Sequence, residues 1–457
     1  MEDRAFDLII CNGTVVTDTG KKALDIGILD GKIAALQPKI HVEASQKIDA
    51  THKLVFPGFI DAHTHMGIPI MDTHSIDDFE SGSIAAACGG VTAIIDFTVQ
   101  EKGQSLRESV DVRIEKARGK SHIDYGLHVN VTDLPEKRVS EIPKLIEEGF
   151  SIYKVFSTYR QIGMMITWQE FRQVLKTVNE NGGLVCLHAE ANDLIESMTA
   201  KNVDAGNLAA IYHPRSRTAE AEAKAIARAA EIAGELDTQL YIVHLSSRAG
   251  LEAALKARER GVKLYLETCP QYLVLSEDYY KKENGFYWIT TPPLRTKEDS
   301  EALWQALADD EIDVVATDHC PFTIAQKEEG NKRFPLTPNG LAGVETLFPL
   351  LYTYGVVEGR ITLEQMVQLL AKNPAEIFDL SSKGSIRIGA GADLVIWDAA
   401  SENVVRAENL HGNGDWSPYE GMSISGSLDY TILGGHTLVE NGRFVGKDVF
   451  GELLKTD

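Results

Sequence analysis

The chain has 457 residues, which is long for one domain and favours one large domain with a smaller one. Hydrophobic residues make up 44% and charged residues 25%, the composition of an ordinary globular protein. The formal net charge is −22, from 67 acidic and 45 basic residues, and no cluster of Lys and Arg stands out. Because nucleic-acid binding depends on such a cluster, this composition argues against a nucleic-acid partner.

The sequence also argues against a membrane partner and an exported protein. Its apolar runs fall short of the ~20 residues of a membrane span, and the acidic N-terminus lacks the charged-then-apolar layout of a signal peptide. The cysteines are scattered singly and odd in number, which predicts reduced thiols rather than a disulfide framework. They are Cys11, Cys88, Cys186, Cys269 and Cys320. We therefore expect a cytoplasmic protein.

Residues 1–50 predict short strands broken by turns, with no helical period. The strand candidates are Asp7–Cys11, Thr14–Thr17 and Asp25–Leu29. The turn signals between and after them are Asn12-Gly13 and Asp30-Gly31. This pattern predicts a small antiparallel sheet that buries little apolar surface by itself.

From Leu54 onward, apolar strand-like runs alternate with amphipathic helical segments. Strands that are apolar on both faces and separated by helices indicate a parallel sheet that is covered on both sides. Eight such strands indicate a (β/α)8 barrel, whereas the alternative, an open doubly wound sheet, lacks a G-x-G-x-x-G nucleotide motif here. The predicted strands are the run that opens at Val55, then Val91–Phe97, Tyr125–Val131, Phe150–Phe156, Leu184–His188, Leu240–Leu245, Lys263–Thr268 and Asp313–Thr317. The helical segments include Ser105–Arg118, Trp168–Asn181, Thr218–Gly234 and Ala249–Arg260.

After a helical tail at Thr362–Leu370, the strand pattern of the first residues returns. Because the two ends of the chain share a pattern that the middle lacks, we predict a discontinuous β-sandwich domain of residues 1–53 and 384–457. Residues 54–383 would then form the barrel. The C-terminal strand candidates are Ala392–Trp397, Leu428–Leu433 and Thr437–Val439, with turn signals at Gly434-Gly435 and Asn441-Gly442.

His63 and His65 end the first apolar run of the predicted barrel and are separated by one residue. In an extended chain, residues i and i+2 point the same way, so both imidazoles can reach one metal ion. Titratable residues also stand at the carboxyl ends of other predicted strands, where a barrel gathers its active site. These residues are Lys154, His188, His244 and Asp318. Imidazole and carboxylate ligands suit zinc and its first-row neighbours.

Each of these residues also has a structural interpretation when it is taken alone. A single His at a strand end is more often a hydrogen-bonded polar group than a ligand, and Asp318 could cap the following helix. Lys154 stands out because a charge inside an apolar strand is costly. Burial lowers a lysine pKa toward the neutral amine, which can react with carbon dioxide to give a carbamate. The two carbamate oxygens can bridge two metal ions, so the joint pattern predicts a metal site.

In order and in combination, the motifs around these residues resemble the amidohydrolase superfamily, and within it the hydantoinase and dihydropyrimidinase branch. The resemblance covers essentially the full length of the chain. Its motifs are P-G-F-I-D-A-H-T-H (57–65), G-G-V-T-A-I-I-D-F (89–97), Y-K-V-F-S-T-Y (153–159), V-C-L-H-A-E (185–190), I-V-H-L-S-S (242–247), E-T-C-P-Q-Y-L (267–273), T-P-P-L-R (291–295), T-D-H-C-P-F (317–322), P-N-G-L-A-G-V-E (338–345) and K-G-S-I-R-I-G-A-G-A-D-L-V-I-W-D (383–398).

The resemblance implies two divalent metal ions, usually zinc, in the mouth of the barrel. The implied ligands are His63, His65 and Asp318 for one ion and His188 and His244 for the other. Lys154, carboxylated by CO2, would bridge the two ions together with a hydroxide. Such a site activates the hydroxide for attack on the scissile carbonyl.

The same resemblance assigns the proton transfer and the substrate contacts. Asp318 would take the proton of the hydroxide and deliver it to the departing nitrogen. Tyr159, which taken alone is a loop tyrosine, would donate its hydroxyl to the forming oxyanion. The main-chain groups of Thr291 and Asn339 would bind the cyclic amide edge of the substrate. Thr291 stands where hydantoinases commonly have serine.

Two departures from the D-hydantoinase pattern concern the pocket for the ring substituent. Met66-Gly67 stands where those enzymes usually have Leu-Asp, and Ser157 stands where they usually have Met. Both positions line or support that pocket in the family. We therefore hypothesise that the smaller Ser157 admits a bulkier or differently oriented substituent.

The resemblance thus implies an enzyme that hydrolyses the ring amide of hydantoins or dihydropyrimidines to N-carbamoyl amino acids, as a homotetramer or homodimer. Allantoinase is the alternative enzyme, because it shares the whole ligand set. Dihydroorotase is less favoured, because its family has an arginine just after the H-x-H pair, where Met66 and Gly67 stand. A non-catalytic scaffold resembling the dihydropyrimidinase-related proteins is disfavoured, because those proteins have lost metal ligands that this chain keeps.

Overall fold

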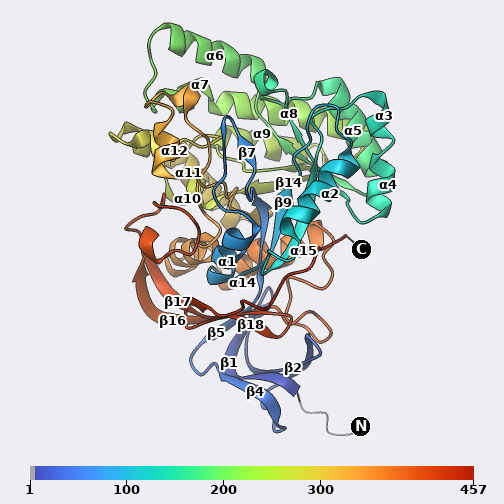
Figure 1. Cartoon of the computed structure of the whole chain (residues 1–457), viewed down its shortest axis with the longest axis vertical. Coiled ribbons are helices and arrows are strands. Elements are labelled where there is room, and N and C mark those ends of the chain that lie inside the picture. The colour runs from blue at the N-terminus through green and yellow to red at the C-terminus, as the bar shows by residue number, and fades with distance from the viewer. Residues whose placement is uncertain (1–5, 457) are drawn as a thin grey trace.

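The computed structural model describes residues 6–456 (Figure 1). Within these residues, the strands form an eight-stranded sheet, a nine-stranded sheet and a two-stranded hairpin. We call the first the barrel sheet and the second the terminal sheet. Figure 1 shows the helices gathered around the barrel sheet and the terminal sheet below them. No helix in this described part is long and apolar enough to cross a bilayer, and the five cysteines are free thiols, as predicted.

The barrel sheet is parallel throughout, and its strands follow one another in chain order. The strands are β6 (Phe59–Thr64), β9 (Val91–Phe97), β10 (Asp124–Asn130), β11 (Ile152–Phe156), β12 (Leu184–His188), β13 (Leu240–Ile242), β14 (Leu264–Thr268) and β15 (Val314–Val315). A parallel bridge between Thr64 and His319 joins the first strand to the segment after the last one. This bridge closes the sheet, and the predicted (β/α)8 barrel is confirmed.

Helices connect the barrel strands and cover their outer faces. The longer ones are α1 (Phe79–Cys88), α2 (Leu106–Ala117), α5 (Trp168–Glu180), α6 (Asn192–Asp204), α8 (Ala219–Leu236), α9 (Arg248–Arg258) and α11 (Lys297–Ala308). The shorter ones are α3 (Glu136–Val139), α4 (Ile142–Glu147), α7 (Tyr212–Ser216), α10 (Pro270–Val274), α12 (Ile324–Glu328) and α13 (Leu347–Leu350). Ser105, Thr167 and Thr296 begin α2, α5 and α11 with capping boxes, which satisfy the first free N–H groups of each helix.

Alternate residues of the barrel strands pack on opposite sides of the sheet. Ile60, Ala93 and Ile95 belong to an inner apolar cluster, whereas Phe59 and Ile94 belong to the outer one that contacts the helices. The inner cluster also contains Ala375, Phe378 and Leu380 from the chain around α15 (Asn373–Ile377). These residues fill the barrel at the end opposite the strand termini discussed below, so the carboxyl ends of the strands form the open mouth.

The terminal sheet combines strands from both ends of the chain, as predicted. Its strands are β1 (Phe6–Thr17), β2 (Gly20–Leu29), β3 (Lys32–Gln37), β4 (Ala44–Asp49), β5 (Leu54–Pro57), β16 (Leu394–Val404), β17 (Ser423–Leu433), β18 (His436–Glu440) and β19 (Arg443–Phe444). β5 joins the two groups, because it pairs with both β1 and β16. The remaining hairpin consists of β7 (Pro69–Ile70) and β8 (Thr73–His74). The division into domains of residues 1–53 plus 384–457 and 54–383 stays a prediction, and residues 1–5 and 457 lie outside the described residues.

The predicted turn at Asn12-Gly13 is wrong, because β1 runs through both residues with a β-bulge. Asn12 adopts a left-handed φ of 63°, and its side chain donates a hydrogen bond to Asp49, 2.8 Å away. The predicted turn at Asp30-Gly31 is confirmed, with φ values of 51° and 72°. Two successive positive φ values are those of a type I′ turn, which suits a two-residue hairpin.

The apolar run from Val55 to His65 contains two strands rather than one. β5 belongs to the terminal sheet and β6 to the barrel sheet, and Gly58 separates them. A Cβ atom at Gly58 would lie 2.1 Å from Thr92 Oγ1, so only glycine allows the chain to pass here. The helical tail is likewise divided, into α14 (Leu363–Val367), a π-helical turn at Gln368–Lys372 and α15.

Candidate functional site

The carboxyl ends of the barrel strands surround a cavity of about 320 Å³. His63 and Lys154 lie within β6 and β11, His188 ends β12, and His244 and Asp318 follow β13 and β15. Every residue that the sequence predicts for the site lines this cavity. These residues are His63, His65, Lys154, Tyr159, His188, His244, Thr291, Asn339 and Asp318.

His63, His65 and Asp318 form the tightest cluster of possible ligands. The Nε2 atoms of His63 and His65 lie 3.2 and 2.8 Å from Asp318 Oδ1. One ligand atom from each residue lies within 4.8 Å of the other two. Two imidazole nitrogens and a carboxylate oxygen at this spacing fit a divalent first-row cation.

The other two histidines complete a continuous group of imidazoles. The ring centroids of His188 and His244 are 4.5 Å apart, and those of His63 and His244 are 5.5 Å apart. Burial lowers the pKa of His63 and of His244 well below the ordinary value, and the charge of Lys154 lowers both further. These imidazoles are therefore neutral at neutral pH, which is the form that binds a metal ion.

Lys154 is buried among these groups. Its Nζ lies 5.1 Å from the ring centroid of Phe97 and 5.2 Å from that of Phe156. Burial lowers the pKa of Lys154 to about 8, although Glu267 and Asp318 favour the charged form. An appreciable fraction of the amine is thus neutral near neutral pH, which a reaction with CO2 requires.

Tyr159, His244 and Asp318 have left-handed backbones, with φ values of 69°, 40° and 54°. Such values are strained for residues with a side chain and persist where surrounding contacts enforce them. His244 N–H donates to Glu267 Oε1 at 2.9 Å. Beside Asp318, the main-chain N–H and the hydroxyl of Thr317 both donate to the buried carboxyl group of Asp61. These contacts fix the direction in which the site residues point.

Glu267, at the end of β14, is a functional residue that the sequence prediction missed. Its carboxyl group lies 2.8 Å from His63 Nδ1 and accepts hydrogen bonds from Tyr241 OH and from the main chain of His244, both at 2.9 Å. Burial raises the pKa of Glu267 to about 8. With Nδ1 held by Glu267, His63 presents Nε2 to the cavity, as an orienting partner of a metal ligand does. The sequence carried one signal for Glu267: a charged residue stands inside the apolar run L-Y-L-E-T, just as Lys154 stands inside an apolar strand.

Glu190 has the same relation to His188, and it was also missed. Its Oε2 lies 2.7 Å from His188 Nε2 and accepts a hydrogen bond from Arg217 at 2.5 Å. Burial raises the pKa of Glu190, but the charge of Arg217 and the contact with His188 outweigh it and bring the pKa to about 2. The contact occupies Nε2, so Nδ1 is the ring nitrogen that His188 can offer to a metal ion.

Tyr159, Thr291 and Asn339 also line the cavity. The Tyr159 ring lies 5.2 Å from the His188 ring and packs against the guanidinium group of Arg217. Asn339 Oδ1 is buried and has no protein hydrogen-bond partner within the described residues, and Thr291 Oγ1 is buried beside the Tyr159 hydroxyl. Unpaired buried polar atoms on a cavity wall are suited to a polar ligand.

Ser157 and Met66 support the cavity rather than line it. Ser157 Oγ lies 3.0 Å from the carbonyl oxygens of His188 and Glu190 and accepts the main-chain N–H of Glu190 at 3.0 Å. Met66 is buried in the outer apolar cluster, and Gly67 turns the chain with a φ of 59°. The apolar lining of the cavity comes partly from Phe97 and Phe156 at the ends of β9 and β11. The rest comes from the segments that connect the barrel strands, namely Ile68, Ile70, Met71, Ile162 and Met164.

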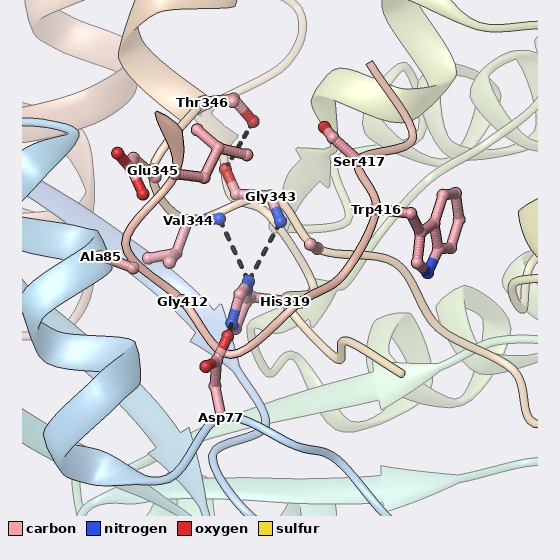
Figure 2. A pocket seen from close by; sticks show the side chains of 13 residues that line it. Asp77, Ala85, His319, Gly343, Val344, Glu345, Thr346, Gly412, Trp416 and Ser417 are labelled. Carbon is pink, nitrogen blue, oxygen red and sulfur yellow. Dashed lines mark hydrogen bonds and ion pairs between the residues drawn. The ribbon is translucent and has the colours of Figure 1, made fainter. Parts of the chain in front are cut away.

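His319 anchors the segment that carries Asp318. Figure 2 shows its ring between Asp77 and the main chain of Gly343 and Val344. His319 Nδ1 accepts the two main-chain N–H groups at 3.0 and 3.2 Å, and Nε2 lies 3.1 Å from Asp77 Oδ2. The carbonyl of His319 accepts the N–H of His65 at 2.9 Å. The positions of His65 and Asp318 are therefore tied together through this residue.

Known proteins of one family match this chain over most of its length. The model of the amidohydrolase family matches residues 54–438. A D-hydantoinase of Geobacillus stearothermophilus is 40% identical over 452 residues, which are 98% of this chain and 96% of the relative. A D-phenylhydantoinase of Escherichia coli (strain K12 / DH10B) is 40% identical over 455 residues, 98% of each chain. The crystal structure of dihydropyrimidinase from Brevibacillus agri NCHU1002 is 36% identical and has a TM-score of 0.96 over 98% of each chain.

These matches cover the barrel and the terminal sheet alike, so they concern the whole architecture rather than one motif. They confirm the resemblance that the sequence motifs indicated. The chain belongs to the amidohydrolase family, and within it to the hydantoinase and dihydropyrimidinase branch.

Proposed function

We propose that this protein hydrolyses the ring amide of hydantoins or dihydropyrimidines to N-carbamoyl amino acids, with the help of two divalent metal ions. The observation that carries the proposal is the convergence of four histidines, a lysine and an aspartate on one cavity. The relatives named D-hydantoinase and D-phenylhydantoinase support the substrate class. The similar structure named dihydropyrimidinase supports the second substrate.

The donor set supports a two-metal centre of zinc ions. His63, His65 and Asp318 would hold one ion, His188 and His244 the other, and Lys154 carboxylated by CO2 would bridge them. The lowered pKa values of His63, His188, His244 and Lys154 favour the neutral forms that these bonds and this carboxylation require. When bound, the ions lower the pKa of a water molecule and polarise the carbonyl of the substrate.

The remaining steps belong to residues of this chain. Asp318 accepts the proton of the attacking water and transfers it to the ring nitrogen as the C–N bond breaks. Tyr159 donates its hydroxyl hydrogen to the carbonyl oxygen as negative charge develops there. Burial raises the pKa of Tyr159, so the phenol keeps the proton that this role needs. The main-chain groups of Thr291 and Asn339 bind the amide edge of the ring.

The assembly and location remain part of the proposal. A homotetramer or homodimer is proposed from the family resemblance, and a cytoplasmic location from the composition and the free thiols. We propose likewise that residues 1–53 plus 384–457 form one domain and residues 54–383 the other. Light scattering of the purified protein would measure its molar mass and thereby test the proposed oligomeric state.

The test is a substrate panel with one protein preparation. Zinc-loaded protein, supplied with bicarbonate, is incubated with dihydrouracil, 5-phenylhydantoin and allantoin, and loss of the ring is followed by ultraviolet absorbance. We expect ring opening of the first two compounds and none with Asp318→Asn. Preference for allantoin would support allantoinase instead, and inactivity on all three would overturn the proposal.

A further inference from the structure

Lys327 is a fully buried lysine that does not line the cavity. It belongs to α12, the short helix labelled in Figure 1. Its Nζ donates hydrogen bonds to the carbonyl oxygens of Ile289, Pro338 and Gly340 at 2.8, 2.7 and 2.9 Å. Within the described residues, no carboxylate lies within ion-pair distance of it. An ammonium group thus has all three of its N–H groups paired with main-chain carbonyls.

A buried lysine without an acidic partner is costly, so its retention calls for a reason. Burial lowers the pKa of Lys327 to about 7. The three carbonyl acceptors act in the opposite direction, because only the protonated amine has a hydrogen for each of them. The side chain is therefore placed as a three-way connection between backbone segments rather than as a partner of another charge.

The connected segments carry the two residues proposed to bind the edge of the substrate ring. Ile289 lies two residues before Thr291, and Pro338 and Gly340 are the neighbours of Asn339. The main-chain N–H of Gly340 also donates to the carbonyl of Ile289 at 3.1 Å. The two segments are thus joined directly and again through Lys327.

We propose that Lys327 is a positioning residue that sets the distance between the main-chain groups of Thr291 and Asn339, and thereby the affinity for the cyclic amide. This inference rests on the proposed function. It deepens that function by separating two tasks: Lys327 acts on substrate binding and leaves the metal ligands untouched. None of the three carbonyls that it binds belongs to a proposed metal ligand.

The test compares Lys327→Met, which keeps an unbranched side chain but removes the three donors, with the zinc-loaded wild-type protein. We expect the KM for 5-phenylhydantoin to rise about tenfold while kcat changes less than about threefold, because uniform binding is lost. Zinc content and inhibition by acetohydroxamic acid, a small probe of the metal centre, should not change. Lys327→Gln, which retains two N–H donors, should restore part of the affinity. Lys332→Met, at an exposed position nearby, is the matched control and should behave as the wild type.

An unchanged KM in Lys327→Met would overturn the inference, as would a loss of zinc parallel to a loss of kcat. Failure of the wild-type protein to open any cyclic amide would instead refute the proposed function. Hydrogen exchange of the wild-type protein gives a readout that needs no variant. The Gly340 amide should be protected before substrate is added; rapid exchange there would contradict a fixed spacing even if both variants failed to fold.

Discussion

The two walls of the cavity differ in how they are held. The wall that carries the histidines and Asp318 stands on strand ends, and buried acceptors such as Glu267, Glu190 and Asp61 fix its side chains. The other wall stands on the segments that connect the barrel strands, and Met71 and Ile162 on it are 50% and 64% exposed. The difference leads us to propose that the chemistry is built on rigid elements, whereas substrate choice depends on segments that tolerate change.

The largest effect should follow from Lys154→Ala. We expect ring opening to fall by on the order of a thousandfold, because the proposed bridge between the two metal ions is removed. Short carboxylic acids such as propionate should restore part of the rate by occupying the space of the carbamate. Zinc analysis and ring-opening rates would measure both effects. Full activity without added acid would show that Lys154 is no bridge.

A smaller effect should follow from Glu267→Gln, which keeps the shape of the side chain but replaces the carboxyl group beside His63 with an amide. We expect zinc affinity to fall by roughly 10- to 100-fold, as for other partners that orient a metal ligand. Competition with a chelator measures it. Tyr241→Phe, which removes one hydrogen bond to Glu267 and leaves its carboxyl group beside His63, is the matched control and should cost less. Equal zinc affinity in wild type and Glu267→Gln would contradict the claim that buried partners such as Glu267 hold the histidines in place.

His213 tests whether buried anchors also support the side of Thr291. Its Nε2 lies 2.7 Å from the carbonyl of Thr290, and burial, with the charge of Arg217, lowers its pKa to about 3. Between pH 6.5 and 3, His213 is therefore protonated in the unfolded state but not in the folded state. The free energy of unfolding consequently decreases as the pH falls through this range. At pH 5 the expected loss is about 2 kcal/mol.

His213→Gln keeps an N–H donor for Thr290 and cannot be protonated. Urea unfolding at pH 7 and pH 5 should therefore show a smaller pH dependence in this variant, by about 2 kcal/mol. The same pH dependence in both proteins would show that His213 does not titrate as the structure indicates.

The smallest effect should follow from a substitution on the cavity wall that stands on the connecting segments. Ile162→Ala should change the ratio of kcat/KM between 5-phenylhydantoin and unsubstituted hydantoin by less than about tenfold, because the side chain is largely exposed. Zinc content should not change. Val357→Ala, another exposed apolar position, is the control and should leave the ratio unaltered. Loss of zinc in Ile162→Ala would mean that the two walls are not independent.

The sequence predicted the barrel because its strands are apolar on both faces. β9 and β12 have the predicted bounds, Val91–Phe97 and Leu184–His188. Local patterns failed where one signal suits two structures. Asn-Gly serves a bulge as well as a turn, and an apolar run does not reveal that Gly58 transfers the chain from one sheet to another.

The residues of the candidate site could be predicted as far as they stand at strand ends. Glu190 was missed because its role depends on Arg217, a partner that only the folded chain brings near. Glu267 stands inside an apolar run, but its contacts with His63 and Tyr241 likewise appear only in the folded chain. The role of Lys327 could not be predicted either, because its hydrogen-bond acceptors are main-chain carbonyls, which every residue has. Residues of the connecting segments, such as Ile162, follow no strand or helix periodicity from which their position on the cavity wall could be predicted.

The central claim is that ring opening depends on metal ions held by the strand-end residues. The most direct test removes metal with a chelator and then returns zinc stepwise in the presence of bicarbonate, with ring opening of 5-phenylhydantoin measured at each step. The account predicts an inactive chelated protein whose activity rises until two zinc ions are bound per chain. Undiminished ring opening by metal-free protein would contradict it, and so would a protein that binds two zinc ions and opens no cyclic amide.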